Sequence, residues 1–296
     1  MKYTKRPFII IVSGPNGAGK TTFYNQLISE NIYLSDAVFL NYDNEIAATK
    51  QLPEISQQYQ DIKQARQDYL LKSKPIATTT TILPFVYKPT TVLSAKLNKF
   101  IEQIHYLNFS AAKLASKNMR KKIKDAFADT KNIVFETTST ANRIKKTATK
   151  HGYDIYGCHI CVTEPELSVS RVQQRVKKGG HDIPKETIYQ RYAENIRTLS
   201  KVMATETSAI VIDNSNKKPF TPIFGLSQGY IIDISDCPEY LQNTYKNLLK
   251  KYKQKSVREI ISLEDDIDIK SLTTAQRKTL TQIILLNMLD KIKFQK

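Results

Sequence analysis

The sequence has few of the residues that build disulfide scaffolds, metal clusters or membrane segments. Its 296 residues include three cysteines, four histidines and no tryptophan. So few cysteines exclude a disulfide-stapled secreted domain and fit a reducing compartment. There is no N-terminal secretion signal, and the apolar run 8–12 is far too short to span a bilayer. We therefore expect a cytoplasmic protein with no membrane partner.

Two of the cysteines, Cys158 and Cys161, form a C-x-x-C pattern. Zinc and redox sites use this pattern, but the chain has no second pair that would complete a zinc site. Both residues lie in the apolar run 155–162, which is typical of a buried strand. We therefore interpret them, and His159 between them, as ordinary strand residues.

Positive charge exceeds negative charge by a wide margin. The formal net charge is +17 at pH 7, and the pI is about 9.6. Such a field attracts nucleotides, sugar phosphates or nucleic acid. Most of the excess is lysine, however, and lysine spread over helices usually forms a solvated face. A nucleic-acid partner is therefore kept as an alternative and is not favoured.

Near its start, the chain passes from an apolar, β-branched run into a glycine-rich turn. The turn reads G-x-x-x-x-G-K-T without a mismatch and consists of Gly14, Pro15, Asn16, Gly17, Ala18, Gly19, Lys20, Thr21 and Thr22. Backbone N–H groups of such a loop converge on phosphate oxygens at the positive end of the following helix. We expect Lys20 to reach the β- and γ-phosphates, Thr21 to bind Mg²⁺ and Thr22 to support the α-phosphate. The apolar run before the loop and the amphipathic run after it favour nucleotide binding over a plain strand-ending turn.

A second predicted strand, 37–43, ends in polar residues. In an open parallel sheet, ligands lie beyond the carboxyl ends of the strands, so Asp43 is expected near the γ-phosphate. A carboxylate there accepts the proton of an attacking hydroxyl group. The alternative is that Asp43 caps the helical pattern that begins at Asn44. The two roles are compatible.

A third predicted strand, 132–136, ends at Glu136, and four hydroxyl residues follow it. A Walker B strand has this pattern, and so has a strand that ends at a substrate site. We expect Glu136 to hold substrate hydroxyls and the hydroxyl side chains after it to bind phosphate or sugar. The alternative for Ser139 and Thr140 is capping of the next helix.

A basic helix and a glycine pair follow the fourth predicted strand, 153–162. The helix carries Arg171 and Arg175, which are four residues apart and therefore share a face, and it stops at Gly179 and Gly180. Basic side chains beside a Gly-Gly hinge suit a lid that closes over a triphosphate. An arginine-rich helix with a glycine cap is also a common solvated element, so both interpretations stay open at this point.

The order of elements predicts an α/β protein with the P-loop NTPase fold. We expect a parallel sheet of about five strands with helices on both faces, a fifth strand at 208–215, and a kinase-like domain over 1–225. A helical insertion is expected at about residues 50–108, and a mostly helical extension over 226–296. The helical patterns outside the sheet are 45–73, 92–107, 110–129, 238–255 and 272–293, with an edge strand at 229–234.

Several ordered segments of the chain together resemble the zeta-toxin family of P-loop kinases. They are the glycine-rich loop 14–22, N-Y-D-x-x-I-A at 41–47, F-E-T-T at 135–138, R-V-x-x-R-V-x-x-G-G-H-D-I-P at 171–184, Arg191-Tyr192 with Asn195, and Asp213-Asn214-Ser215. Order and spacing agree over residues 8–220, apart from the excursion between 50 and 108. Some members of the family carry an arginine near the position of His181. The Gly-Gly-His triplet of this sequence instead resembles a zeta-like branch of the family.

The resemblance implies an ATP- and Mg²⁺-dependent kinase that phosphorylates a hydroxyl group of a nucleotide sugar such as UDP-N-acetylglucosamine. It also implies an antitoxin as protein partner. Carried over by position, Lys20 and Thr21 hold phosphate and metal, and Asp43 is the base. Arg175 is the best match to the catalytic arginine of the family, and Arg171 is a further candidate.

On the acceptor side, the resemblance assigns Glu136 and Thr138 to substrate contacts, with His181 and Arg191 as further candidates. The residues alone are also compatible with two other functions. One is a polynucleotide or RNA end kinase, which the net charge would favour. The other is a nucleotide-dependent binding module without an acceptor, in which the helical insertion and the C-terminal extension would be interaction surfaces.

Overall fold

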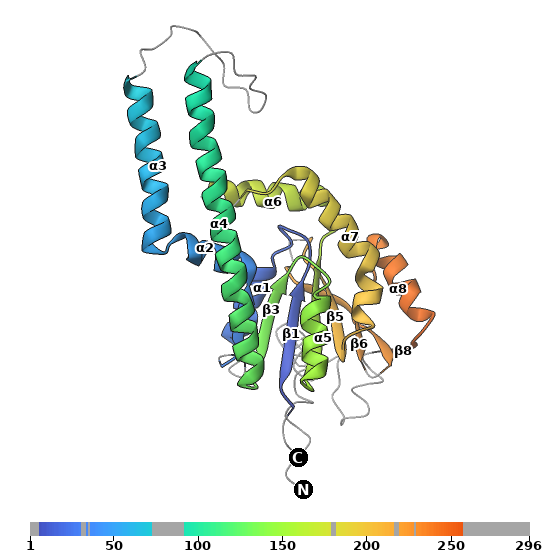
Figure 1. Ribbon diagram of the computed structural model, residues 1–296. Helices are drawn as coiled ribbons and strands as arrows, with labels where there is room; N and C mark the ends of the chain where they lie inside the picture. The colour runs from blue at the N-terminus through green and yellow to red at the C-terminus, as the bar shows by residue number, and fades with distance from the viewer. Residues whose placement is uncertain are drawn as a thin grey trace. The chain divides into compact units, whose positions relative to one another are not determined.

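An eight-stranded sheet is the core of the larger of two compact units in the computed structural model (Figure 1). The structure describes residues 6–30, 34, 36–72, 92–178, 182–215, 219–227 and 229–256. The strands are β1 (Phe8–Ser13), β2 (Val38–Asn41), β3 (Ile133–Thr137), β4 (Asp154–Cys161), β5 (Ser208–Asp213), β6 (Thr221–Ser227), β7 (Tyr230–Asp233) and β8 (Lys253–Ser256). The helices are α1 (Lys20–Glu30), α2 (Tyr42–Lys50), α3 (Pro53–Lys72), α4 (Val92–Ala128), α5 (Asn142–Lys150), α6 (Pro165–Lys177), α7 (Lys185–Met203) and α8 (Gln242–Leu249), with a 3₁₀ turn η2 at Glu239–Leu241.

The strand order is β2-β3-β1-β4-β5-β6-β7-β8, and β3, β1, β4 and β5 pair in parallel. β1 and β5 are buried along their whole length, as a parallel strand covered on both faces requires. This arrangement confirms the predicted α/β class and the P-loop NTPase fold. The register places Ser13, the last residue of β1, opposite Thr137 of β3 and His159 of β4. The three strands therefore end at about the same level, where ligands bind in open α/β sheets.

Helices cover both faces of this sheet (Figure 1). On one face, Phe23 of α1 packs in a core with Val12 of β1. On the other face, Met203 of α7 and Leu248 of α8 share a core with Val211 of β5. Because neighbouring residues of a strand point to opposite faces, each strand supplies side chains to both cores.

The C-x-x-C pair is divided between these two cores. Cys158 lies in the core beneath α1, and Cys161 lies in the core beneath α7 and α8. Burial, with a smaller contribution from a nearby carboxylate in each case, raises the pKa of each thiol to about 12. The two thiols therefore face away from each other and stay protonated, which confirms their interpretation as ordinary strand residues.

Beyond β5 the sheet continues through strands of mixed direction. β6 is antiparallel to β5 and β7, and β7 is parallel to β8. The predicted strand at 229–234 is β7, but it lies between β6 and β8 and not at an edge. The predicted helix 238–255 is wrong at its end, because residues 253–256 pair with the backbone of β7. The predicted helix 272–293 lies outside the described residues.

The second compact unit, Asn41–Lys124, is helical. In it α3 and α4 are joined by a hydrogen bond of 2.7 Å from the Tyr59 hydroxyl to Asn108 Oδ1. The predicted pair of helices at 92–107 and 110–129 is wrong, because α4 runs unbroken from Val92 to Ala128. Neither glycine nor proline occurs in that stretch, so nothing in it interrupts a helix.

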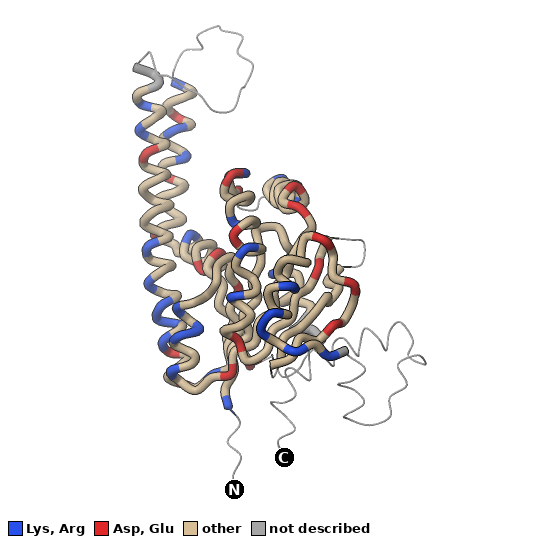
Figure 2. The backbone as a smooth tube through the Cα atoms, turned by 90° about the vertical axis from the view of Figure 1, so that its right-hand side faces the viewer, with Lys and Arg blue, Asp and Glu red and all other residues tan. Residues whose placement is uncertain are grey.

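Basic residues gather in the carboxyl-terminal part of α4 (Figure 2). Arg120, Lys121 and Lys124 are exposed there, while Met119 is buried. This alternation is that of an amphipathic helix with a solvated basic face, as predicted. No helix in the described part of the chain combines the length and the apolar character needed to cross a membrane.

The strands after β5 are expected to be an integral part of the folded sheet. Ile231 of β7 is fully buried, so Ile231→Ala should lower the free energy of unfolding by about 2–5 kcal/mol. Leu71→Ala on the exposed end of α3 is the control and should change it by less than about 0.5 kcal/mol. Denaturant unfolding followed by circular dichroism measures both. An unchanged midpoint for Ile231→Ala would contradict the continuity of the sheet.

Candidate functional site

The chain leaves the sheet after Ser13 and turns tightly before α1 begins at Lys20. Positive φ angles of 149°, 77° and 94° occur at Gly14, Gly17 and Gly19. A side chain would be strained in these conformations, which is why the loop needs glycine. The first N–H groups of α1 have no acceptor within the helix, and the helix dipole adds positive potential at the same place. The predicted loop therefore has the backbone shape of an anion-binding site.

The loop is also packed closely against its surroundings. A Cβ atom at Gly14 would overlap the carbonyl group of Ile160 in β4. One at Gly17 would lie 2.5 Å from the carbonyl oxygen of Ser168 in α6. The glycines thus serve two purposes, since they allow the turn and let β4 and α6 approach the loop backbone. Only the first purpose is visible in the sequence pattern.

Lys20 is folded over this loop. Its side chain donates a hydrogen bond of 3.0 Å from Nζ to the carbonyl oxygen of Pro15. The residue is 7% exposed, so its ammonium group is held at the loop and does not extend into solvent. A positive charge in this position lies where the predicted phosphate groups would bind.

Thr21 and Glu136 are brought together by the fold. The Thr21 hydroxyl group lies 3.0 Å from each carboxylate oxygen of Glu136. Thr21 is in the first turn of α1, and Glu136 is near the end of β3. The sequence predicts a metal contact for Thr21 and a substrate contact for Glu136. The structure brings the two side chains into contact at the start of α1, where Thr21 follows Lys20.

Arg171 of α6 contacts the loop through the backbone. Its guanidinium group donates to the carbonyl oxygen of Asn214 (2.7 Å) and, at 3.5 Å, to that of Gly17. Partial burial lowers the pKa of Arg171, and the opposing effect of Asp213 is smaller. Asn214 in turn donates from Nδ2 to the carbonyl oxygen of Ala18 (2.7 Å). Arg171 and Asn214 therefore tie α6 and the end of β5 to the loop.

Asn214 belongs to the segment Asp213-Asn214-Ser215 that carries part of the family resemblance, but the sequence prediction gave it no role in the site. It lies within the fifth predicted strand, 208–215, and directly after β5 as the structure has it. The signal that could have found it is its position, because polar residues after a parallel strand reach the same edge as the glycine-rich loop.

Helix α7 contacts the loop from another direction. Arg191 donates from its guanidinium group to Asn16 Oδ1 (2.8 Å), and the Asn16 side chain is largely buried. Asn195, one turn further on, donates to the carbonyl oxygen of Thr138 (3.1 Å). The structure thus brings Arg191 to the loop and Thr138 to α7, so both predicted substrate residues lie around the same site.

The family of the chain follows from a comparison with protein-family models. The model described as an AAA domain matches residues 9–197, which is more than half of the chain. The chain belongs to the AAA domain family. The match begins in β1 and ends in α7, so it contains the glycine-rich loop, Glu136, Arg171 and Arg191.

Two solved structures are similar to this AAA domain protein. One comes from the PezAT chromosomal toxin–antitoxin system of Streptococcus pneumoniae, with 15% identity and a TM-score of 0.44 over 84% of this chain and 87% of that chain. The other is the AvrRxo1-ORF1:-ORF2 structure with ATP, with 13% identity and a TM-score of 0.42 over 82% of this chain and 63% of that chain. A comparison with curated proteins finds no match. Neither structural similarity assigns an activity to the AAA domain protein.

The predicted base, Asp43, belongs to the helical unit and lies in the first turn of α2. It does not cap that helix, because Asn41 does: Asn41 Oδ1 accepts hydrogen bonds from the backbone N–H groups of Asp43 (2.8 Å) and Asn44 (3.1 Å). Asp43 itself is exposed. Its proposed role as a base stays a prediction.

The structure describes some of the other predicted site residues, and others lie outside the described residues. Arg175 is exposed on α6, one turn beyond Arg171. His181 and the glycine pair before it lie outside the described residues. Ser139 and Thr140 do not cap α5, whose N-cap residue is Ala141 with no side-chain hydrogen bond. Among the described residues, no group of three or more His, Cys, Asp or Glu side chains is arranged to hold a metal ion.

The two arginines of α6 are expected to differ in their effect on stability. Arg171→Ala leaves two backbone carbonyl groups without their donor and should lower the free energy of unfolding by about 1–3 kcal/mol. Arg175→Ala, the matched control on the exposed face, should change it by less than about 0.5 kcal/mol. Guanidinium unfolding of the ligand-free protein distinguishes them. Equal losses would contradict the anchoring role of Arg171.

Proposed function

We propose that this AAA domain protein is a kinase that transfers the γ-phosphate of ATP to a hydroxyl group of a small acceptor. The observation that carries the proposal is the contact of the Thr21 hydroxyl group, one residue after Lys20, with both carboxylate oxygens of Glu136, at 3.0 Å each. A glycine-rich loop alone supports nucleotide binding. A carboxylate from a neighbouring strand end adds what phosphate transfer needs, a place for a metal ion or for the acceptor.

The residues at this cluster suit Mg²⁺. Magnesium prefers hard oxygen ligands and is usually held by one or two protein groups together with substrate phosphates. Thr21 Oγ1 would be a direct ligand, and Glu136 would bind the ion or its water molecules. When bound, the ion neutralises charge on the β- and γ-phosphates. We therefore assign Thr21 to the metal, and Glu136 to the place between the metal and the acceptor.

The loop suits the triphosphate of ATP. Its glycine backbone and the start of α1 present N–H groups to phosphate oxygens, and Lys20 would turn from the Pro15 carbonyl oxygen to the β- and γ-phosphates. Arg171 and Arg191 hold the loop from α6 and α7 and so keep it in shape for this contact. Arg175 would supply positive charge to the transferred phosphoryl group, in the role of the catalytic arginine of the zeta-toxin family.

For the acceptor, we propose a nucleotide sugar such as UDP-N-acetylglucosamine, on the strength of the ordered zeta-toxin motifs in the sequence. Asp43 would accept the proton of the attacking hydroxyl group, while Glu136, Thr138, His181 and Arg191 would line the acceptor side. The same resemblance supports an antitoxin protein as the partner that restrains the activity.

Asp43→Asn tests the assignment of the base. The substitution removes the proton acceptor and keeps size and hydrogen bonding, so transfer should fall about 10²–10⁴-fold while the Kd for MgATP changes little. Asp61→Asn on α3, another carboxylate of the helical unit, is the matched control and should leave both unchanged. Phosphate transfer from labelled ATP and calorimetry of MgATP binding give the two values. Undiminished transfer in Asp43→Asn would show that the base is another group.

The acceptor can be identified directly by mass spectrometry of metabolites from cells that express the protein. We expect a new phosphorylated nucleotide sugar, and none in cells that express Lys20→Ala. The purified protein should form the same product from ATP and UDP-N-acetylglucosamine. Nucleotide binding without any phosphorylated product, across a panel of sugar nucleotides and small alcohols, would favour a binding module in place of a kinase.

A further inference from the structure

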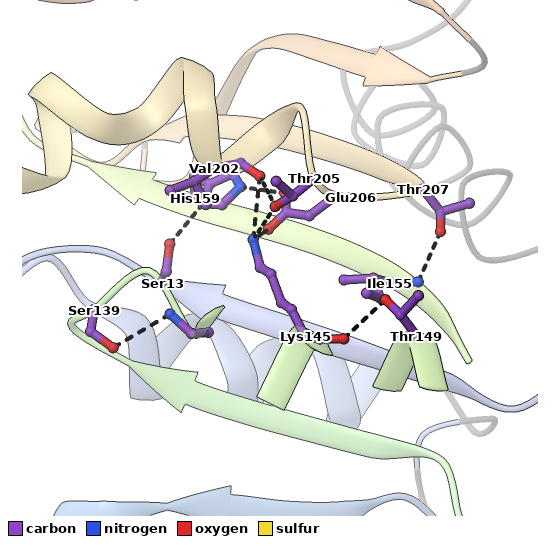
Figure 3. A network of polar contacts seen from close by, with 11 residues as sticks. Ser13, Ser139, Lys145, Thr149, Ile155, His159, Val202, Thr205, Glu206 and Thr207 are labelled. Carbon is purple, nitrogen blue, oxygen red and sulfur yellow. Dashed lines mark hydrogen bonds and ion pairs between the residues drawn. The ribbon is translucent and has the colours of Figure 1, made fainter. Parts of the chain in front are cut away.

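A chain of four buried polar side chains lies on the face of the sheet covered by α5 and α7 (Figure 3). It runs from Lys145 of α5 to Glu206 in the turn before β5, then to His159 of β4, and ends at Ser13 of β1. Lys145 forms an ion pair with Glu206 Oε1, and His159 Nε2 lies 2.8 Å from Glu206 Oε2. His159 Nδ1 lies 2.7 Å from the Ser13 hydroxyl group. The four residues come from distant parts of the sequence.

Within this polar chain of side chains, the charges of Lys145 and Glu206 balance each other. The Glu206 side chain is 0% exposed, and an unpaired carboxylate there would be strongly destabilising. Lys145 also donates to the carbonyl oxygen of Val202 (3.3 Å) and to Thr205 Oγ1 (3.2 Å). Burial acts to raise the pKa of Glu206, but its contacts with His159 and Lys145 outweigh burial and hold that pKa below its ordinary value.

This balance sets the direction of the remaining hydrogen bonds. One ammonium group and one carboxylate cancel, so a neutral His159 leaves no net buried charge. An ionised Glu206 only accepts, so His159 must donate to it from Nε2. In the neutral ring Nδ1 is then an acceptor, and the Ser13 hydroxyl group donates to it. His159 thereby fixes the rotation of the Ser13 side chain.

Ser13 stands at the point where the phosphate-binding loop begins. The next residue, Gly14, packs against the carbonyl group of Ile160, the residue that follows His159 in β4. β4 therefore contacts the start of the loop twice, with the His159 side chain at Ser13 and with its own backbone at Gly14. Gly157 of the same strand leaves the space that Glu206 occupies, since a Cβ atom there would overlap the carboxylate.

We propose that His159 is a positioning residue, which acts through Ser13 to fix the exit of the phosphate-binding loop from β1. Glu206 and Lys145 hold His159 in the orientation and tautomer that this requires. The inference concerns the loop in the nucleotide-free protein and does not depend on the acceptor or on phosphate transfer.

Hydrogen exchange of the backbone amides of residues 14–22, without nucleotide, tests the proposal. Ser13→Ala removes the last hydrogen bond and leaves the Lys145–Glu206 ion pair and the His159–Glu206 hydrogen bond in place, and it should speed exchange of the loop about fivefold to tenfold. His159→Gln should have a similar effect. The double variant should exchange no faster than the more affected single variant, because both substitutions break one connection.

Val211→Ala is the matched control. Val211 is buried in β5 and lies directly opposite His159 in the sheet register, but it is not part of the polar chain. Its truncation should lower global stability and leave loop exchange unchanged. If Ser13→Ala exchanged at the wild-type rate, or if Val211→Ala sped loop exchange equally, the positioning role would be overturned.

The ring nitrogens of His159 provide a second readout, which loss of packing alone would not move. Nitrogen NMR of the wild-type protein should show Nε2 protonated and Nδ1 as an acceptor, and the Nδ1 shift should change in Ser13→Ala. A proton on Nδ1, or an Nδ1 shift that Ser13→Ala leaves unaltered, would overturn the proposed connection. A wild-type protein that failed to bind MgATP would refute the proposed function and leave these exchange and NMR results standing.

Discussion

The parallel register of β1 between β3 and β4 is the constraint on which the site depends. Because Ser13 lies opposite Thr137 and His159, the turn after β1, the carboxylate near the end of β3 and the imidazole of β4 lie at one level. A shift of either pairing by one residue would turn Glu136 or His159 to the opposite face of the sheet. The site is thus specified by the packing that aligns the strands as much as by its own side chains.

The loop between β1 and α1 is held from several sides. β4 contacts it at Gly14, α6 at Gly17, and Asn214 at Ala18. Arg171 joins the last two of these contacts, so the first half of α6 is attached to the loop.

Those parts of the fold that depend on local pattern were predictable from the sequence. The glycine-rich loop and the buried strands each have a recognisable pattern of residue types. Glu136 stands near the end of one of these strands, β3. Helix boundaries within the unit 41–124 were less predictable, since residues 107–110 resemble a break without containing a glycine or proline. β8 has no apolar alternation of its own, and only its pairing with β7 makes it a strand.

Contacts between distant segments were not predictable from the pattern of residue types. Arg171 reads as a lid arginine, yet its partners are backbone carbonyl groups, which leave no trace in a sequence. In the run 41–44, Asn41 and Asp43 are both good capping residues, and the choice between them depends on where the helix begins. Lys145 and Glu206 are 61 residues apart and look like two ordinary surface charges.

Because Gly157 has no side chain, positions 157 and 206 constrain each other. The carboxylate of Glu206 occupies the volume that any larger residue at 157 would need, so the two positions are tied by excluded space. While the acid is present, any larger residue at position 157 would have to displace its carboxylate. Without the acid, the carboxylate would no longer exclude alanine or a larger residue from position 157, and the buried ammonium group of Lys145 would lose its carboxylate partner.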